Sequence, residues 1–527
     1  MKKIVNYLFV LFIGLLSFVG VVNSKKFSIY VNIETGTMSI DGVNYQDIVK
    51  YDDLEAFLDD YKSNKLPKIY LTSFLFDGVS SVKTFDLDDF IESGSNSTKI
   101  KTLKINVLNI NTTGDIELTG TSKGYMIGVN TNELKGNINL ILNNVNIDTD
   151  TKKAPCVYVY NKDITYTDVK VTIKSKAGSL NYIEGGKFKK TSLMASDELD
   201  SYSKYYSGDN LSNYEKYSSY YGVYTKDEIK NILFASVTAD SDGLKDGDPY
   251  YFYKGSGVIS SDIDLYFEGE GYLKVISKNK EGIETKGNLV FSGGTGDYEI
   301  NSMDDCLNTS TKSSAGKSVR NNLIIDVNTL VAIVSDEGDE GDAIDSNGML
   351  TINGGNIYAF AHSSSGDAGL DSENGTIING GRVIATGNMV DRVSSESKQN
   401  FIYVSFDKKQ EKDTLIVIKD QDNNIITAFK TGKDISTLFY SSDDLDYEKL
   451  TIYSGGFIDG EEVNGLYTKI NSYEDGSVIS YKEISSFDGF KEDNFILKLL
   501  VVEVISLVIL IGYILISKYM LNKKIPS

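Results

Sequence analysis

The chain has 527 residues, with 74 Asp or Glu against 53 Lys or Arg, which gives a formal net charge of −21. An acidic surface of this size repels phosphates, which excludes a nucleic-acid partner, and it is typical of solvated faces or bound cations. Two cysteines exclude a disulfide scaffold, and a single histidine, His362, argues against a zinc site and against nucleophilic triads. With 35 Tyr, 23 Phe, no Trp and four Pro, the composition favours a strand-rich extracellular protein.

The N-terminus is typical of a secretion signal over residues 1–24. Lys2 and Lys3 precede an apolar run over residues 8–22, and the small residue Ser24 precedes the expected cleavage site. An uncleaved membrane anchor is the alternative. The mature protein would begin near Lys25.

Residues 25–98 are predicted to form a small mixed leader. Two short strands are expected at residues 27–33 and 37–40, and one amphipathic helix at residues 52–61. We expect this segment to cap the first strands of the following domain, because an open end would expose apolar core and strand edges.

Alternating strands become regular from Ile100 and are interrupted over residues 187–253. Eleven tyrosines crowd residues 202–253. One interpretation is a surface loop with its own small cluster. The other is a platform of rings that stack on sugar faces. For the second interpretation the candidate carbohydrate-binding residues are Tyr205, Tyr206, Tyr220 and Tyr221.

Five similar segments follow, each with a small residue, an aliphatic residue, a polar residue and a hydroxyl. The aliphatic residues are separated by 24, 24, 37 and 26 positions, and the long step contains a polar insert at residues 311–320. These aliphatic residues are Ile259, Ile283, Leu307, Ile344 and Leu370. A period of 20 to 30 residues made of short strands is typical of a solenoid. The repeat therefore predicts an all-β, right-handed parallel β-helix over residues 99–400, with the aliphatic side chains in one buried ladder.

The repeat also argues, on distance grounds alone, against a disulfide between the two cysteines. Cys156 and Cys306 both precede a repeat aliphatic, at Val157 and Leu307. With Ile183 counted as an intervening repeat, they lie four strands apart, or about 19 Å at about 4.8 Å a strand. A disulfide tolerates about 7 Å between Cα atoms, so both cysteines are predicted to be small buried residues.

A family resemblance becomes specific in these repeats. Gly-Ile-x-Thr at residues 282–285, Gly-Gly at residues 293–294 and Ala-Gly-Leu-Asp-Ser at residues 368–372 resemble secreted bacterial carbohydrate-binding β-helix domains. The resemblance covers residues 100–460 and is interrupted once. It implies binding of cell-wall polysaccharides such as cellulose and pectic polymers, bound Ca²⁺, and a fold shared with polysaccharide lyases.

The strongest chemical cluster is acidic, with six carboxylates within residues 336–345. Carboxylates beside glycine-turn carbonyls are hard oxygen ligands of the kind that Ca²⁺ prefers. The candidate metal ligands are Asp304, Asp305, Asp336, Asp339, Asp342, Asp345, Asp367 and Asp371, with Glu281 and Glu284 brought near by stacking. A solvated acidic loop is the alternative, in which the carboxylates splay into water.

After the repeat, alternating residues predict a small antiparallel β module at residues 401–460 and a polar stalk at residues 461–493. The largely apolar run of 22 residues at 495–516 is long enough for a transmembrane helix. Lys518, Lys523 and Lys524 follow and place the tail, residues 517–527, in the cytoplasm. These features predict a single-pass plasma-membrane protein with an extracellular N-terminal domain.

The sequence favours a membrane-anchored, calcium-dependent polysaccharide-binding protein over two alternatives. A calcium-dependent polysaccharide lyase would need a desolvated Lys or Arg base. Candidates are Lys278, Lys280, Lys286, Arg320 and Arg382, and none lies in an apolar stretch. The third class is a surface adhesin in which the solenoid is a spacer. No catalytic residue is assigned.

Overall fold

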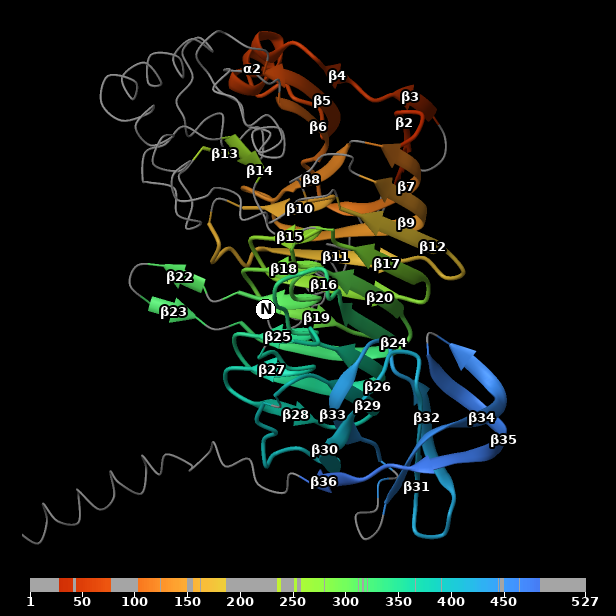
Figure 1. The fold of residues 1–527 in the computed structure, drawn as a ribbon. Helices are drawn as coiled ribbons and strands as arrows, with labels where there is room; N and C mark the ends of the chain where they lie inside the picture. Colours follow the sequence, from red (N-terminus) through yellow and green to blue (C-terminus); the bar gives the residue numbers. More distant parts are fainter. Residues whose placement is uncertain are drawn as a thin grey trace, which may run out of the picture. The chain divides into compact units, whose positions relative to one another are not determined.

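The computed structural model describes most of residues 28–483 (Figure 1). Its gaps are residues 41–43, 77–102, 124, 149–154, 162, 186–234, 238–250, 254–256, 279, 311, 315–316, 320, 365, 390, 444, 446–449 and 464. The predicted signal peptide, transmembrane helix and cytoplasmic tail lie outside the described residues. So do the four candidate carbohydrate-binding tyrosines, Tyr205, Tyr206, Tyr220 and Tyr221.

The expected short helix is present as α2 (Leu54–Lys62). Asp53 caps it, because its carboxylate accepts a hydrogen bond from the Ala56 amide at 2.9 Å. Phe57 on its buried face packs edge-on against the ring of Tyr51, with centroids 5.4 Å apart. The helix therefore packs against the strand that ends at Tyr51.

A ten-stranded sheet carries the aliphatic ladder. Its strands, in spatial order, are β27 (Asp371–Ser372), β25 (Ile344–Ser346), β21 (Leu307–Thr309), β18 (Ile283–Thr285), β15 (Ile259–Ser261), β10 (Val157–Tyr160), β8 (Met126–Asn130), β6 (Leu103–Ile110), β5 (Ile69–Phe76) and β4 (Lys50–Tyr51). Ile259 lies opposite Ile283, Ile283 opposite Leu307, and Leu307 opposite Ile344. These four side chains are fully buried, and Leu370, the fifth, is 7% exposed and precedes Asp371, which lies opposite Asp345. The predicted register is therefore confirmed.

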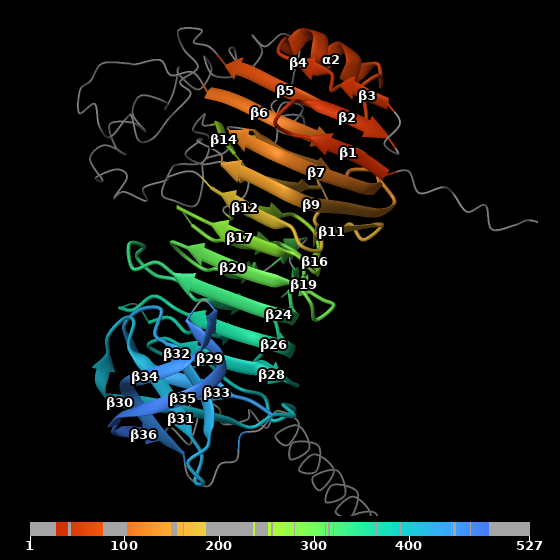
Figure 2. The ribbon, with the colours of Figure 1, turned by 90° about the vertical axis from the view of Figure 1, so that its right-hand side faces the viewer.

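An eighteen-stranded mixed sheet faces the first (Figure 2). Its strands are β1 (Ser28–Asn32), β2 (Thr37–Ile40), β3 (Asn44–Asp47), β7 (Gly114–Lys123), β9 (Gly136–Asp148), β11 (Val169–Ser175), β12 (Leu180–Glu184), β16 (Leu265–Gly269), β17 (Tyr272–Ile276), β19 (Leu289–Phe291), β20 (Asp297–Ser302), β24 (Leu323–Val334), β26 (Leu350–Phe360), β28 (Thr376–Ile378), β29 (Arg382–Thr386), β30 (Phe401–Gln410), β33 (Ile435–Ser441) and β36 (Tyr481–Glu483). A Cβ on Gly282, just before β18 of the ten-stranded sheet, would clash with the Ile300 side chain of this sheet. The two sheets therefore share one core at that level.

Glycine is required where neighbouring repeats approach most closely. Gly355 has φ +109° and Gly381 has φ +93°, values that side-chain-bearing residues rarely adopt. A Cβ on Gly381 would lie 2.5 Å from the Gly355 carbonyl oxygen. The paired glycines of the sequence repeat thus allow each strand to pack against the next.

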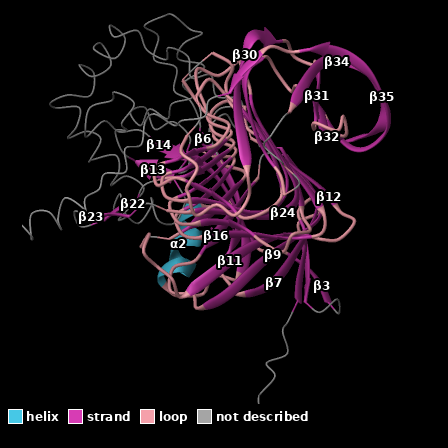
Figure 3. Ribbon diagram, turned by 90° about the horizontal axis from the view of Figure 1, so that it is seen from below, coloured by secondary structure: helices cyan, strands magenta, loops and turns pink. Residues whose placement is uncertain are grey.

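The C-terminal part contains a closed barrel (Figure 3). Its strands are β31 (Leu415–Lys419), β32 (Ile425–Lys430), β35 (Leu466–Val478) and β34 (Thr451–Val463). The barrel packs on the eighteen-stranded sheet, because Phe429 of β32 lies 5.9 Å, centroid to centroid, from Tyr358 of β26. Strand β35 occupies part of the segment predicted to be a stalk.

Two inserts contain strand pairs. The polar insert in the repeat holds β22 (Lys312–Ser314) and β23 (Lys317–Val319), which pair antiparallel. Within the predicted tyrosine-rich insertion, β13 (Ala235–Val237) pairs with β14 (Tyr251–Tyr253). Residues 187–234 and 238–250 of that insertion lie outside the described residues.

The expected fold, a right-handed parallel β-helix closed by a small antiparallel module and followed by a transmembrane helix, is corrected by the structure. The described residues are all-β apart from α2, but they form an eighteen-stranded mixed sheet, a ten-stranded sheet and a closed barrel. The repeat specifies register between neighbouring strands, because each repeat places like side chains on one face. It carries no signal for the antiparallel strands β2, β30 and β33 or for barrel closure.

The predicted single-pass plasma-membrane topology is also corrected. No helix in the described part of the chain is long and apolar enough to cross a membrane. Helix α2 has nine residues, whereas a spanning helix needs about 20. The segment predicted to span, residues 495–516, lies outside the described part.

The two cysteines are free and buried, as predicted, but one count behind that prediction is wrong. Val157 lies opposite Ile259, so Cys156 and Cys306 are three strands apart in the ten-stranded sheet. Ile183, counted as an intervening repeat, pairs instead with Val275 in the other sheet.

Candidate functional site

A column of polar side chains runs across the ten-stranded sheet, one position after each residue of the buried ladder. We call it the carboxylate column, and it consists of Ser260, Glu284, Asn308, Asp345 and Asp371. These residues lie directly opposite one another on consecutive parallel strands. Such strands are about 4.8 Å apart, so the side chains are immediate neighbours. Alternation along each strand places them on the face opposite the ladder.

A second acidic row, the turn row, precedes the same strands and consists of Glu281, Asp305 and Asp342. The Asp305 carboxylate accepts a hydrogen bond from the Asp342 amide at 2.8 Å, and the Asp342 carboxylate accepts one from the Ala368 amide at 2.6 Å. The Asn308 amide group donates to the other oxygen of Asp305 at 2.5 Å. Each aspartate of the turn row is thereby fixed to the next strand of the sheet.

Burial makes these carboxylates hard to ionise. It raises the pKa of Asp342 and of Asp345 to about 8, and the negative charge of Asp371 adds to both shifts. Burial and the neighbouring Glu284 raise the pKa of Glu281 to about 7. The pKa of Asp305 is also raised, first by burial and then by nearby aspartates. At neutral pH the site therefore either keeps some of these protons or needs a cation to relieve the repulsion between its carboxylates.

The site offers oxygen atoms of the kind that calcium prefers, but it is not a preformed metal site. Glu281 Oε2 and Asn308 Oδ1 are buried and have no hydrogen-bond partner within the described residues. Asp305, Asp342, Asp345 and Asp371 form no ion pair with Lys or Arg there. However, no three His, Cys, Asp or Glu side chains among the described residues converge as a metal-binding group. The donor chemistry fits Ca²⁺, and binding would require side chains to turn toward the ion.

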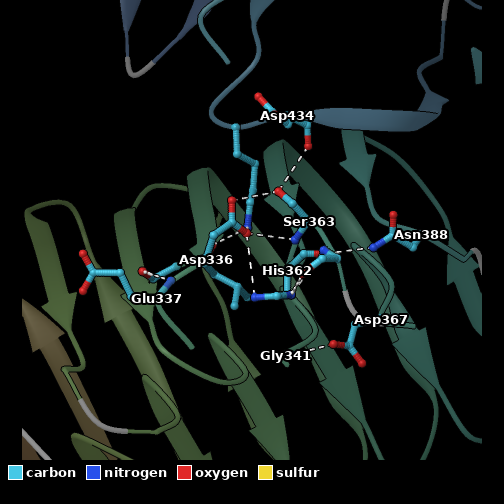
Figure 4. Close-up of polar contacts among 12 residues, drawn as sticks. Asp336, Glu337, Gly341, His362, Ser363, Asp367, Asn388 and Asp434 are labelled. Carbon is cyan, nitrogen blue, oxygen red and sulfur yellow. Dashed lines mark hydrogen bonds and ion pairs between the residues drawn. The ribbon is translucent and has the colours of Figure 1, made fainter. Parts of the chain in front are cut away.

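Asp336 belongs to a different cluster, shown in Figure 4. Its carboxylate accepts hydrogen bonds from the amide and hydroxyl of Ser363, both at 2.9 Å, and pairs with the Lys433 ammonium at 2.6 Å. Burial would raise the pKa of Asp336, but these contacts outweigh it and the pKa is lowered. Asp336 therefore ties the sheet to the segment that leaves the barrel.

Of the remaining predicted metal ligands, two lie near the carboxylate column and one is exposed to solvent. Asp304 and Asp367 lie close enough to raise the pKa of Asp345 and Asp342, respectively. The Asp367 carboxylate also accepts a hydrogen bond from the Gly341 amide at 2.6 Å. Asp339 is exposed. The structure thus gathers six of the eight candidates near the column and leaves Asp336 and Asp339 elsewhere.

Two of the predicted lyase bases, Lys286 and Lys278, are held in ion pairs. Burial would lower the pKa of Lys286, but its ion pair with Asp262 at 2.9 Å outweighs burial and raises it. Lys278 pairs with Glu184. Sequence reasoning missed Lys433, whose pKa is lowered by burial, and no apolar run around it signals that burial. Lys433 is only 5% exposed, so a polymer has no access to it.

The comparisons with known proteins bear on the same region. A family model described as "Carbohydrate-binding domain-containing protein" matches residues 223–428. These residues include the whole carboxylate column and turn row. Over these residues the chain is therefore similar to a carbohydrate-binding family. No curated protein and no solved structure matches the chain significantly.

Proposed function

We propose that the chain binds polysaccharide along the carboxylate column and that Ca²⁺ assists by neutralising the carboxylates. The observation that carries this proposal is the group formed by Asp345 and Asp371, which lie opposite each other on adjacent strands, and by Asp305 and Asp342 of the turn row. The pKa of each of these four acids is raised, first of all by burial. The family match over residues 223–428 supports the ligand class. Carboxylates accept hydrogen bonds from hydroxyls when ionised and donate one when protonated, so they suit a polyol.

The repetition of the site argues for a polymer rather than a single sugar. Equivalent polar groups recur on β15, β18, β21, β25 and β27 at the strand spacing of about 4.8 Å. A chain of repeating hydroxylated rings can engage several of them at once, which raises avidity without requiring any one strong contact.

The net charge of the protein assigns a role to calcium. A polymer of uronate groups would be repelled by a chain of net charge −21 unless a cation lay between them. Ca²⁺ held by column oxygens can also bind a uronate carboxylate, because it takes six to eight oxygen ligands. Calcium dependence is therefore expected for acidic polysaccharide in particular.

Affinity electrophoresis in polygalacturonate, with excess Ca²⁺ or with a chelator, tests the proposal. We expect retardation with Ca²⁺ that falls at least about tenfold in apparent affinity in the Asp342→Asn, Asp345→Asn double variant. The matched control is Glu337→Gln with Glu340→Gln, which removes two exposed charges from the same loop and should leave binding unchanged. Equal losses in both double variants, or no retardation of the wild-type protein by polygalacturonate or by neutral glucan, would contradict the proposal.

A further inference from the structure

A second surface of interest lies on the outer face of the eighteen-stranded sheet, where β12, β17 and β20 are adjacent (Figure 2). Leu180 and Tyr182 of β12 are 54% and 41% exposed, whereas the alternate residues Asn181 and Ile183 are buried. Two large apolar side chains therefore point outward from the same strand, on a face separate from the carboxylate column.

Strand register adds a third side chain. Tyr272 of β17 lies directly opposite Leu180, although the two are far apart in sequence. The rings of Tyr182 and Tyr272 meet edge to face, with centroids 6.1 Å apart and an interplanar angle of 67°. We call Leu180, Tyr182 and Tyr272 the aromatic platform.

A polar hub at the border of the platform holds one ring in place. Glu299 of β20 accepts hydrogen bonds from the Tyr272 hydroxyl at 2.5 Å and from Asn301 at 3.1 Å, and it pairs with Lys274 at 2.7 Å. Burial would raise the pKa of Glu299, but these contacts outweigh it and the pKa is lowered. The hub is therefore an ionised carboxylate beside a matching ammonium.

Two other groups of apolar side chains on this sheet are covered. Toward the C-terminus, Val331, Tyr358 and Ile384 of β24, β26 and β29 are buried in the cluster that seats the barrel. On β16, the Tyr266 ring carries the Lys170 ammonium 4.2 Å from its centroid. The platform instead presents its ring and aliphatic surface to solvent, with its orientation fixed by the sheet and the hub.

We propose that the aromatic platform is a second carbohydrate-binding site, which takes the apolar face of a neutral glycan. A sugar ring has a face of C–H groups that stacks on an aromatic ring, while its hydroxyls find donors and acceptors in Lys274, Glu299 and Asn301. At the border of the platform the charges of Lys274 and Glu299 cancel, so this surface suits an uncharged polyol. An acidic polymer would need an unpaired cation here, and the Lys274 ammonium is already paired with Glu299.

The proposal is independent of the carboxylate column and of calcium, so the test is done in chelator. Depletion isotherms on insoluble cellulose, a neutral glucan, give the dissociation constant of the full chain. Tyr182→Ala should raise that constant about tenfold, since it removes a preorganised stacking surface. The matched control is Tyr266→Ala, an aromatic residue on the same sheet whose ring is already covered, and it should leave the constant unchanged. Leu180→Ser, at the most exposed platform position, should raise it about threefold.

Three results would overturn the platform. They are no binding of the wild-type protein to cellulose, wild-type affinity in Tyr182→Ala, and an equal loss in Tyr266→Ala. If the melting curve shows that Tyr182→Ala does not fold, the dissociation constant of Leu180→Ser for cellulose is used instead, and a wild-type value would overturn the platform. Calcium-dependent retention on polygalacturonate should be unchanged in Tyr182→Ala, so failure of the platform and failure of the column give different results.

Discussion

The repeat-built sheets and the C-terminal barrel use the same kind of strand but obtain their register differently. In the ten-stranded sheet the ladder strands pair with the preceding repeat, so that Ile283 contacts its counterparts Ile259 and Leu307. The barrel has no repeat, and β32 closes it against β35 through the single pair Phe429 and Leu466. In the sheets each repeat supplies another pair that specifies the register. In the barrel, by contrast, the pairing of β32 with β35 depends on one residue pair. The sheets can therefore carry a column of mutually repelling acids without losing alignment.

The sharpest way to break the sheets is to place a charge in the ladder. Ile283→Asp should cost several kcal/mol, because an unpaired carboxylate would be buried between Ile259 and Leu307. That cost is comparable to the whole stability of many domains, about 5–15 kcal/mol. We expect loss of cooperative unfolding in denaturant titrations. The control is Val290→Asp on β19, at a partly exposed position, which should keep the transition. Similar curves for both variants would show that the ladder does not hold the sheet.

These contrasts explain how far the sequence predicts the structure. The ladder was predictable because each aliphatic residue recurs in the same context, and the neighbouring acids were predictable for the same reason. The barrel was not, because β34 and β35 pair through a long hairpin with no internal repeat. The platform was not either, since Tyr182 and Tyr272 meet only after a long insertion between them. Asp336 belongs to the same acidic run as Asp345, but it forms an ion pair with Lys433, far along the sequence, and so does not join the carboxylate column.

The barrel should be broken by a cavity rather than by a charge. Phe429 is fully buried and packs on Tyr358 of the sheet, so Phe429→Ala should cost about 3–5 kcal/mol. Because closure depends on this position, hydrogen exchange should accelerate in β31 and β32 before it does in β18. Phe457→Ala on β34 is the matched control, since that ring is 63% exposed, and it should change stability by less than about 0.5 kcal/mol. Uniform acceleration across the sheets would argue against a separately closed barrel.

In metal-free protein, the acids should make the sheets less stable as the pH rises. The pKa of Asp342 and of Asp345 is about 8 when folded, against an ordinary value of 3.8. The folded state holds these protons more tightly, so the stabilisation is complete below the unfolded pKa and is lost as the pH rises through about 8. Melting temperatures in chelator should fall by several degrees between about pH 5 and about pH 8.5.

Calcium and charge removal sharpen that prediction. Free Ca²⁺ at a hundred times its dissociation constant should add about 2.7 kcal/mol at the upper pH. The Asp342→Asn, Asp345→Asn double variant should lose both the pH dependence and the response to chelator. If chelator still lowers the melting temperature of the double variant, calcium binds at a site other than the carboxylate column. An unresponsive wild-type protein would favour a solvated acidic surface.

The smallest expected effect is at Lys433, where the two regions meet between β32 and β33. Its ammonium pairs with Asp336 and donates to the Val334 carbonyl, both at 2.6 Å. The Asp336 side chain is 48% exposed, so water can solvate it once the lysine is lost, and the cost is below that of a buried pair. Lys433→Met keeps the length and apolar packing of the side chain and should cost about 1–2 kcal/mol, mainly for the carbonyl.

A double-mutant cycle with Asp336→Asn isolates the ion pair from the packing, because an asparagine side chain at that position keeps the shape but not the charge. We expect a coupling of at least about 0.5 kcal/mol between the two substitutions in the free energy of unfolding. If the lysine also couples the barrel to the sheets, Lys433→Met should separate one denaturant transition into two. Additive effects with a single transition would mean that packing around Phe429 and Tyr358, rather than charge, joins the two regions.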